Sequence, residues 1–106
     1  MKKTGSLKVS LSGTLDQVHL IMHPNEGFDL GLMRAEHTVK LCLDMKLEAY
    51  LKGDDTRSDF VFIALKNECP RETIVMGAGL HRALGNPSRA VVLFDGNRLY
   101  LHGQPG

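Results

Sequence analysis

The last part of the chain constrains the fold most, because two apolar segments there flank a tight-turn sequence. Residues 89–94 and 98–102 are separated by Asp95-Gly96-Asn97. The pairs Asp-Gly and Gly-Asn both supply, at little cost, the positive φ angles that a short hairpin turn requires. The sequence therefore predicts a C-terminal β-hairpin. Its strands carry too many apolar residues to stand exposed, so we expect them to be buried against a helix or a partner subunit.

Alternation of apolar and polar residues predicts further strands. Leu7–Leu11 and residues 18–22 both alternate in this way, and the break between them is typical of an N-terminal hairpin. Residues 60–65 and Thr73–Met76 are also expected to be strands. Pro24-Asn25-Glu26-Gly27 is dense in turn-forming residues, so we expect a turn after the second strand.

Residues 28–53 fit two different structures. The segment is rich in good helix formers, and five apolar residues fall at helical spacing: Leu32, Ala35, Val39, Cys42 and Leu43. From residue 39 to 51, apolar residues also occupy alternate positions, as in a strand. Two alternatives stay open. Either one helix runs from about residue 30 to 52, or a helix at 30–44 is followed by a strand at 46–51, which would complete a β-α-β unit with the strand at 18–22.

These elements predict the α+β fold class. We expect a mixed or antiparallel sheet of five to seven strands, with one main helix on one face and the C-terminal β-hairpin. The main helix is placed at about residues 30–44, or up to 52 in the longer alternative. A chain of 106 residues has the size of one domain, so residues 1–106 are predicted to form a single domain. With 42% hydrophobic and 24% charged residues, the composition is that of an ordinary globular protein.

Charge and cysteine content restrict the cellular compartments and the binding partners that can be expected for this chain. Thirteen basic and twelve acidic residues give a net charge of +1, too little to attract nucleic acid or an anionic membrane over the whole surface. The apolar runs at 60–65 and 90–94 are far shorter than the ~20 residues of a membrane span, and residues 4–13 lack the apolar core of a secretion signal. Cys42 and Cys69 match no zinc or redox spacing, which indicates free thiols. We therefore expect a cytoplasmic protein with no membrane partner, and the charge disfavours nucleic acid as a partner.

The most specific local signal for a binding site follows the strand Thr73–Met76. In Gly77-Ala-Gly79-Leu-His81-Arg82, a glycine pair leads into the start of a helix. Such a turn presents backbone N–H groups and the positive end of a helix dipole to an anion, and Arg82 can add a charge-assisted hydrogen bond. A dinucleotide-binding fingerprint needs a third glycine where Arg82 stands, so a purely structural turn is the alternative. The candidate residues for a small anionic ligand are Gly77, Gly79, His81 and Arg82.

Cys69 is the candidate reactive thiol, because it precedes Pro70 in a predicted loop. Glu68 would raise its pKa and Arg71 would lower it, so the flanking charges do not indicate an activated nucleophile. The histidines at 19, 23, 37, 81 and 102 lack the spacing of metal ligands, and the sequence contains no Gly-x-Ser-x-Gly or His-Glu-x-x-His motif. No metal, no cofactor and no catalytic residue are therefore assigned from the sequence.

Two segments resemble known families. Residues 74–101 resemble the AbrB-type swapped-hairpin DNA-binding module, whose short Leu-Arg-x-x-Leu-Gly helix and terminal hairpin are matched by Leu80-His81-Arg82-Ala83-Leu84-Gly85 and residues 89–101. Gly77 and Gly79 stand where that family has a proline and an acidic residue. If residues 18–51 form a β-α-β unit, the first half is similar to DsrE-type sulfur-relay proteins, whose cysteine lies in a later loop, as Cys69 does. The first resemblance implies DNA binding, and the second implies a sulfur-relay role.

The leading functional prediction is a non-catalytic binding or regulatory module that forms a homo-oligomer. It rests on the lack of a catalytic set of residues and on the apolar terminal strands, which a symmetric partner would cover. The alternative is a small enzyme or carrier that binds an anionic ligand at residues 77–82, with Cys69 or His81 as the chemical group. A DNA-binding regulator of the AbrB type is the third prediction.

Overall fold

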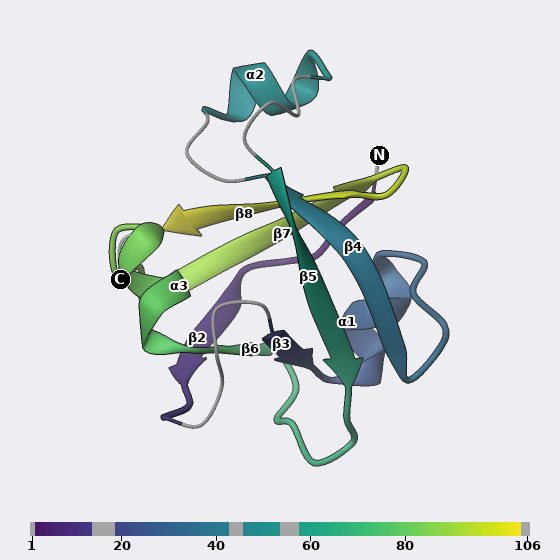
Figure 1. Ribbon diagram of the computed structural model, residues 1–106. Helices are drawn as coiled ribbons and strands as arrows, with labels where there is room; N and C mark the ends of the chain where they lie inside the picture. The colour runs from purple at the N-terminus through teal and green to yellow at the C-terminus, as the bar shows by residue number, and fades with distance from the viewer. Residues whose placement is uncertain (1, 14–18, 43–45, 54–57, 105–106) are drawn as a thin grey trace.

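One β-sheet closes on itself to form the wall of the molecule (Figure 1). The computed structural model describes residues 2–13, 19–42, 46–53 and 58–104, and within them the sheet has eight strands. These are β1 (Lys2–Lys3), β2 (Leu7–Leu11), β3 (His19–Met22), β4 (Glu36–Cys42), β5 (Ser58–Leu65), β6 (Thr73–Met76), β7 (Arg89–Asp95) and β8 (Arg98–Gln104). Their order is β1-β7-β2-β6-β3-β5-β4-β8, and β8 also pairs with β7, which closes the barrel.

The described strands fill seven positions in the barrel wall, because β1 and β2 pair in turn with one edge of β7. Between the two paired stretches the N-terminal strand has three residues, 4–6, whereas β7 has two, 91–92. One extra residue on one strand is the count of a β-bulge. Thr4 holds the bulge to β7, because its N–H donates to the carbonyl of Val92 and its Oγ1 accepts from the N–H of the same residue.

The predicted α+β sheet with one main helix is wrong, because the chain is mostly β with three short helices in its described part. In place of the helix predicted at residues 30–44, β4 occupies most of the described segment. The stretch at 46–51, expected to extend the helix or to form a strand, contains instead the short helix α2 (Leu47–Leu51). Residues 43–45, which the prediction also covered, lie outside the described residues.

Strand pairing explains why helix propensity did not decide this segment. β4 pairs with β5 along its whole length and with β8 at residues 40–42. Val39 joins the barrel interior, whereas Cys42 joins a separate cluster on the outside, although a helix would have placed both on one face. Helix propensities of ordinary residues differ by only tenths of a kcal/mol each. Packing between two neighbouring strands outweighs differences of that size.

The predicted N-terminal hairpin is also wrong, because β6 lies between β2 and β3. β6 is parallel to β2 and antiparallel to β3. The pairs β3–β5 and β4–β8 are parallel as well. A tight turn cannot connect parallel strands, so these neighbours cannot be deduced from local turn sequences. Val18, which the prediction included in the second strand, lies outside the described residues.

The C-terminal hairpin forms where the turn sequence places it. β7 and β8 are antiparallel, and Asp95 and Arg98 are the last pair before the turn. Gly96, the first residue of the turn, has a φ angle of +64°. A type II′ turn requires this conformation at its first central position, and glycine adopts it without steric strain.

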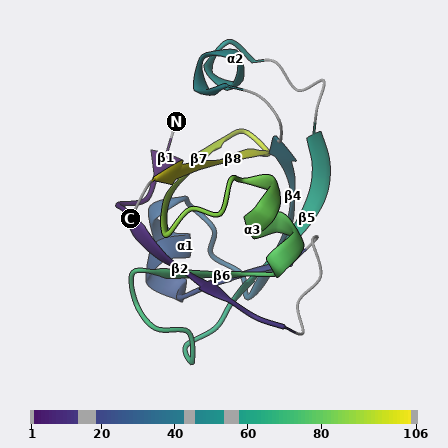
Figure 2. The ribbon, with the colours of Figure 1, turned by 90° about the vertical axis from the view of Figure 1, so that its left-hand side faces the viewer.

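Apolar side chains from alternate strand positions fill the barrel. Leu20 and Met22 in β3 and Val61 and Ile63 in β5 are all at most 1% exposed. The same core includes residues from the two helices named α1 (Pro24–Asp29) and α3 (Ala78–Ala83) or from the segments next to them. Figure 2 looks along the barrel and shows α3 across the near opening with α1 behind it. These helices therefore close the two ends of the barrel.

The segment predicted as a turn at residues 24–27 is the first turn of α1. Pro24 occupies the first helical position, where its missing N–H is not needed, and Glu26 adds an acidic residue to the first turn. His23 is the N-cap, and its Nδ1 accepts a hydrogen bond from the N–H of Asn25 at 3.1 Å. The same residues that favour a turn thus also start a helix.

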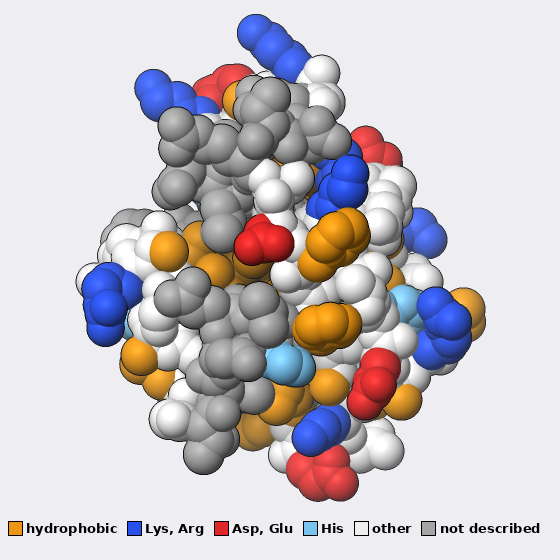
Figure 3. Space-filling model, viewed as in Figure 1, with side chains coloured by type: hydrophobic (Ala, Val, Ile, Leu, Met, Phe, Trp, Pro, Cys, Tyr) orange, Lys and Arg blue, Asp and Glu red, His pale blue; other side chains and the backbone are white. Residues whose placement is uncertain are grey.

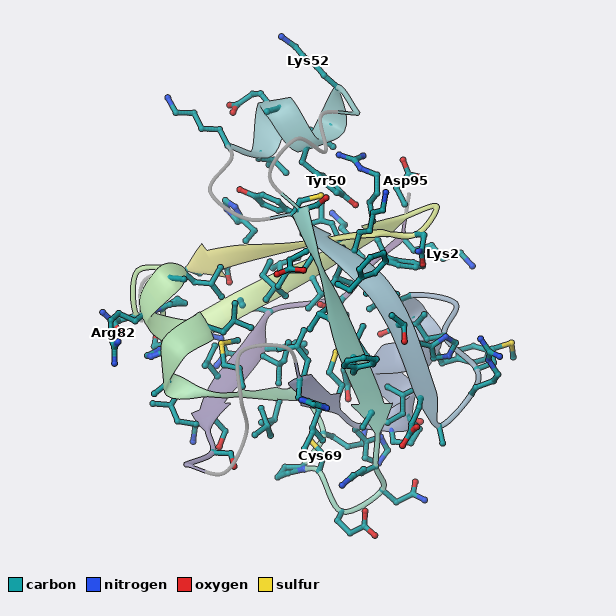
Figure 4. The ribbon with its side chains drawn as sticks, in the orientation of Figure 1. Lys2, Tyr50, Lys52, Cys69, Arg82 and Asp95 are labelled. Carbon is teal, nitrogen blue, oxygen red and sulfur yellow. The ribbon has the colours of Figure 1, made fainter. Side chains whose placement is uncertain are left out.

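Helix α2 covers the outside of the terminal hairpin (Figure 4). Tyr50 of α2 is fully buried against Cys42, Leu93 and Tyr100, and its ring stacks on that of Tyr100 with 5.1 Å between the centroids. The Tyr50 hydroxyl donates to the carbonyl of Arg98 at 2.9 Å, and the Arg98 guanidinium donates back to the Tyr50 carbonyl at 3.3 Å. The outer side of the hairpin is therefore buried by α2, whereas its inner side chains are buried in the barrel core.

Candidate functional site

The outer surface of β3, β5 and β4 carries exposed aromatic side chains. Phe60 and Phe62 on β5 are 55% and 46% exposed, and they alternate with the buried residues Val61 and Ile63. His19 on β3 lies opposite Phe62, with 5.3 Å between the ring centroids. Figure 3 shows hydrophobic side chains and a histidine gathered in the middle of this side of the molecule. We call this surface the aromatic face.

Strand register fixes the arrangement of the aromatic face. The pairings of β5 with β4 and β3 place its side chains in three rows across the strands: Lys40 and Phe60; Thr38, Phe62 and His19; Glu36, Ala64 and Ile21. Side chains on one side of a sheet repeat every second residue, so all of these point outward. The result is an apolar centre on β5, with Glu36 and Lys40 on β4 on either side of Thr38.

A surface pocket of about 530 Å³ opens beside the row that contains Phe62. Arg34, Glu36 and His37 also line it. The Nε2 of His37 accepts a hydrogen bond from the backbone N–H of Arg34 at 3.1 Å, so the proton of the neutral ring belongs on Nδ1. Burial and the charge of Arg34 lower the pKa of His37, which keeps the ring neutral at neutral pH. The pocket thus offers an imidazole donor, a guanidinium and a carboxylate next to an aromatic ring.

The residues predicted as an anion site are spread over the length of α3, because His81 and Arg82 lie in its last turn rather than at its start. Gly77 is the buried N-cap with a φ angle of −77°, which any residue can adopt, and Gly79 is in the helix. His81 Nε2 is 2.7 Å from the carbonyl oxygen of Pro87, so the imidazole is already engaged within the chain. Arg82 is exposed and points away from the barrel in Figure 4. Anion binding here stays a prediction, which a titration with phosphate would test through the amide resonances of residues 77–82.

The candidate thiol Cys69 lies in the connection between β5 and β6, at the lower side of the molecule in Figure 4, and is only 6% exposed. Burial and the negative charge of Glu26, itself 4% exposed, raise the pKa of the Cys69 thiol. Its Sγ donates to the carbonyls of Pro70 and Thr73 at 3.6 and 3.8 Å. A protonated, buried thiol is a poor nucleophile. Its reactive role stays a prediction, and this geometry does not favour it.

In the described part of the chain, no group of three or more His, Cys, Asp or Glu side chains is placed to hold a metal ion. No helix of the same part is long and apolar enough to cross a membrane.

Sequence reasoning missed the aromatic face because the run at residues 60–65 is almost entirely apolar. Such a run predicts a strand but does not tell which side faces the core. Glu26 was missed as the neighbour of Cys69 for another reason, because the two are far apart in sequence. The sequence did carry one signal for Glu26. This glutamate lies in a segment rich in Pro, Asn and Gly, and a short helix that starts there can bury the side chains of its first turn.

No protein-family model matches this sequence, and no curated protein matches it significantly. The resemblance to the AbrB-type module therefore rests on the sequence pattern of residues 74–101 alone. The resemblance to DsrE-type proteins loses its basis, because the second strand of the expected β-α-β unit is the helix α2 (Leu47–Leu51) instead.

Proposed function

We propose that this protein is a non-catalytic binding module that associates with another polypeptide through the aromatic face. The observation that carries this proposal is the exposure of Phe60 and Phe62, at 55% and 46%, on one strand of a well-packed barrel. Burial of a phenylalanine side chain is worth about 1.5–3 kcal/mol. Apolar patches of this kind on a protein surface mark sites of association.

The layout of the aromatic face supports the proposal. Protein interfaces have an apolar centre, rich in aromatic residues, inside a polar rim. Here the phenylalanines occupy the central strand β5, with Glu36 and Lys40 on the neighbouring strand. Phe28 and Met33 are also exposed, but they belong to α1 and the loop after it and line a separate pocket of about 420 Å³. The aromatic face is the more regular of the two surfaces, because strand pairing fixes its side chains.

Site-specific photo-crosslinking tests the proposal. A photo-reactive phenylalanine analogue at position 62 should give an adduct of defined mass in extract of the cells that make the protein. The same analogue in place of Phe28, which is 65% exposed, is the matched control and should not give that adduct. The proposal fails if position 62 yields no defined adduct, or if position 28 yields the same one.

A cytoplasmic location remains part of the proposal. Cys42 and Cys69 are both buried thiols outside any disulfide, in keeping with a reducing compartment. A regulatory role would follow if binding changed the activity of the partner. That measurement becomes possible once the crosslinked partner has been identified.

A further inference from the structure

We propose that the pocket beside α1 binds a small monocarboxylate with an apolar body, such as a short fatty acid. This pocket of about 420 Å³ is lined by residues of α1, of the loop at 30–35 and of the end of β5. Its volume falls within the range of about 300–1,000 Å³ that is usual for small-molecule pockets. Both the surface and the class of ligand differ from those of the proposed function, so either can be correct without the other.

Hydrogen bonds and close packing fix the walls of the pocket. The N–H of Leu32 donates to the carbonyl of Gly27 at 2.9 Å, which fastens the loop to α1. The N–H of Leu65 donates to the carbonyl of Ala35 at 2.8 Å, which fastens the end of the loop to β5. Gly27 has no side chain where Leu65 packs, and a Cβ there would lie 2.5 Å from a methyl group of Leu65. The pocket is therefore preformed, which lowers the entropic cost of binding a ligand.

Two apolar side chains at this pocket are unusually exposed. Met33 and Phe28 are 76% and 65% exposed, the highest values among the large apolar side chains in the described part of the chain. Both line the pocket, together with the buried Leu32 and the partly buried Leu65. Methionine is unbranched and flexible, so it can adapt to the shape of an apolar ligand. A ligand with an apolar body would remove these two side chains from water.

Arg34 gives the pocket its charge. The other polar side chains there are the amides of Asn25 and Asn67, and none of the described residues that line the pocket is acidic. The exposed Arg34 guanidinium forms no ion pair with any residue in the ranges that the structure describes. Arg34 also lines the pocket on the aromatic face, but Glu36 supplies a negative charge there. A positive charge beside apolar walls is complementary to a carboxylate with an apolar body.

The chemistry of the lining selects the class of ligand further. A guanidinium binds a carboxylate through two parallel hydrogen bonds, an arrangement that an alcohol or an amine cannot reproduce. The amides of Asn25 and Asn67 can each donate a further hydrogen bond to an anion. One guanidinium matches one negative charge, which favours a monocarboxylate over a phosphate. A ligand of roughly ten non-hydrogen atoms in a surface pocket should have a Kd of about 0.1–1 mM.

Titration of the isotope-labelled chain with octanoate at about pH 7, followed through its amide resonances, tests the proposal. Octanoate is ionised at this pH, and its chain is apolar. The amides of residues 24–35 and 65–67 should shift in a saturable way, with a Kd of about 0.1–1 mM. Octylammonium has the same chain and the opposite charge, so it should bind about tenfold more weakly or worse.

Single substitutions separate the charged contact from the apolar contact. Arg34→Gln should weaken octanoate binding about fivefold and bring it close to that of octan-1-ol. Lys52→Gln, at the C-cap of α2, removes the same charge from a distant exposed position and should leave the affinity unchanged (Figure 4). Met33→Ser should weaken binding about threefold or more, whereas Leu51→Ser, at a 53% exposed position on α2, should not. Unchanged amide resonances away from each substitution check that the variant is folded.

The proposal is overturned if about 10 mM octanoate causes no saturable shift. Equal binding of octanoate and octylammonium, or an affinity for octanoate that Arg34→Gln does not change, also overturns it. Shifts centred on Phe60 and Phe62 would place the ligand on the aromatic face instead. A defined polypeptide adduct from the photo-reactive analogue at position 28 would show that a protein covers this pocket, which again contradicts a small-molecule site.

Discussion

Alkaline pH should remove the stability that the hydroxyl of Tyr50 contributes to the fold. Burial raises the pKa of Tyr50 from 10.0 to about 12, even though the charge of Arg98 acts in the opposite direction. The folded protein therefore prefers the protonated side chain more strongly than the unfolded chain does. This contribution is fully present below the unfolded pKa of 10.0 and is lost as the pH rises through the folded pKa of about 12.

The magnitude follows from the size of the shift. One pKa unit is worth about 1.36 kcal/mol, so at about pH 11 the unfolded tyrosine is mostly ionised and the fold loses about 1.4 kcal/mol. Above pH 12 the loss approaches about 2.7 kcal/mol. At neutral pH the hydrogen bond from Tyr50 to the Arg98 carbonyl contributes about 1 kcal/mol. Tyr50→Phe should thus be about 1 kcal/mol less stable than the unchanged protein at about pH 8, and about 0.4 kcal/mol more stable at about pH 11.

Urea unfolding of both proteins at the two pH values measures this change. The raised pKa of Tyr100, which is caused by burial and the charge of Glu48, affects both proteins alike and cancels in the difference between them. A difference in unfolding free energy that stays the same at both pH values would refute the reasoning. It would mean that Tyr50 is not held in a buried position between α2 and the hairpin.

Three further predictions follow from single positions. Gly96→Ala should destabilise the fold by about 1 kcal/mol, because the turn holds this residue at a φ of +64°, whereas Gly13→Ala, with open space around it, should have little effect on urea unfolding. Glu26→Gln should raise the unfolding free energy by about 1 kcal/mol, because it removes a charge from a buried side chain whose Oε2 has no hydrogen-bond partner among the described residues. In a Cys42→Ser background, Cys69 should react with a thiol reagent at neutral pH more slowly than free cysteine and should speed up in urea, because burial and Glu26 raise its pKa.

Local features were predictable where the residues of a single segment determine its structure. The hairpin turn needs only Gly96 and its neighbours, and β6 is an apolar segment that ends at the glycine pair. The partner of each strand was not predictable, because the barrel places β6 between β2 and β3 and pairs β4 with β8 in parallel. Those contacts depend on segments far apart in sequence, and no turn type selects them.

The candidate site was hidden for the same reason. Phe60 and Phe62 occur in a run of apolar residues, so the pattern predicts burial for both sides of the strand. Only barrel closure decides that Val61 and Ile63 face inward and that the phenylalanines face outward. The central segment shows the opposite case. Its apolar residues do fall at helical spacing. Val39 and Cys42 nevertheless lie on different sides of β4, because this segment forms a strand that pairs with its neighbours in the barrel wall.

Closure of the sheet also decides how this protein can bind another. Most strand edges are paired within the barrel, so a partner must approach a face of side chains rather than add a strand. The outer surface of the hairpin shows how such a surface is covered in this protein. Tyr50 of α2 packs on it and leaves Leu93 and Tyr100 only 9% exposed. The adjoining face has comparable apolar content, yet Phe60 and Phe62 remain about half exposed. A partner that supplies apolar side chains to this face would do for β5 what α2 does for the hairpin.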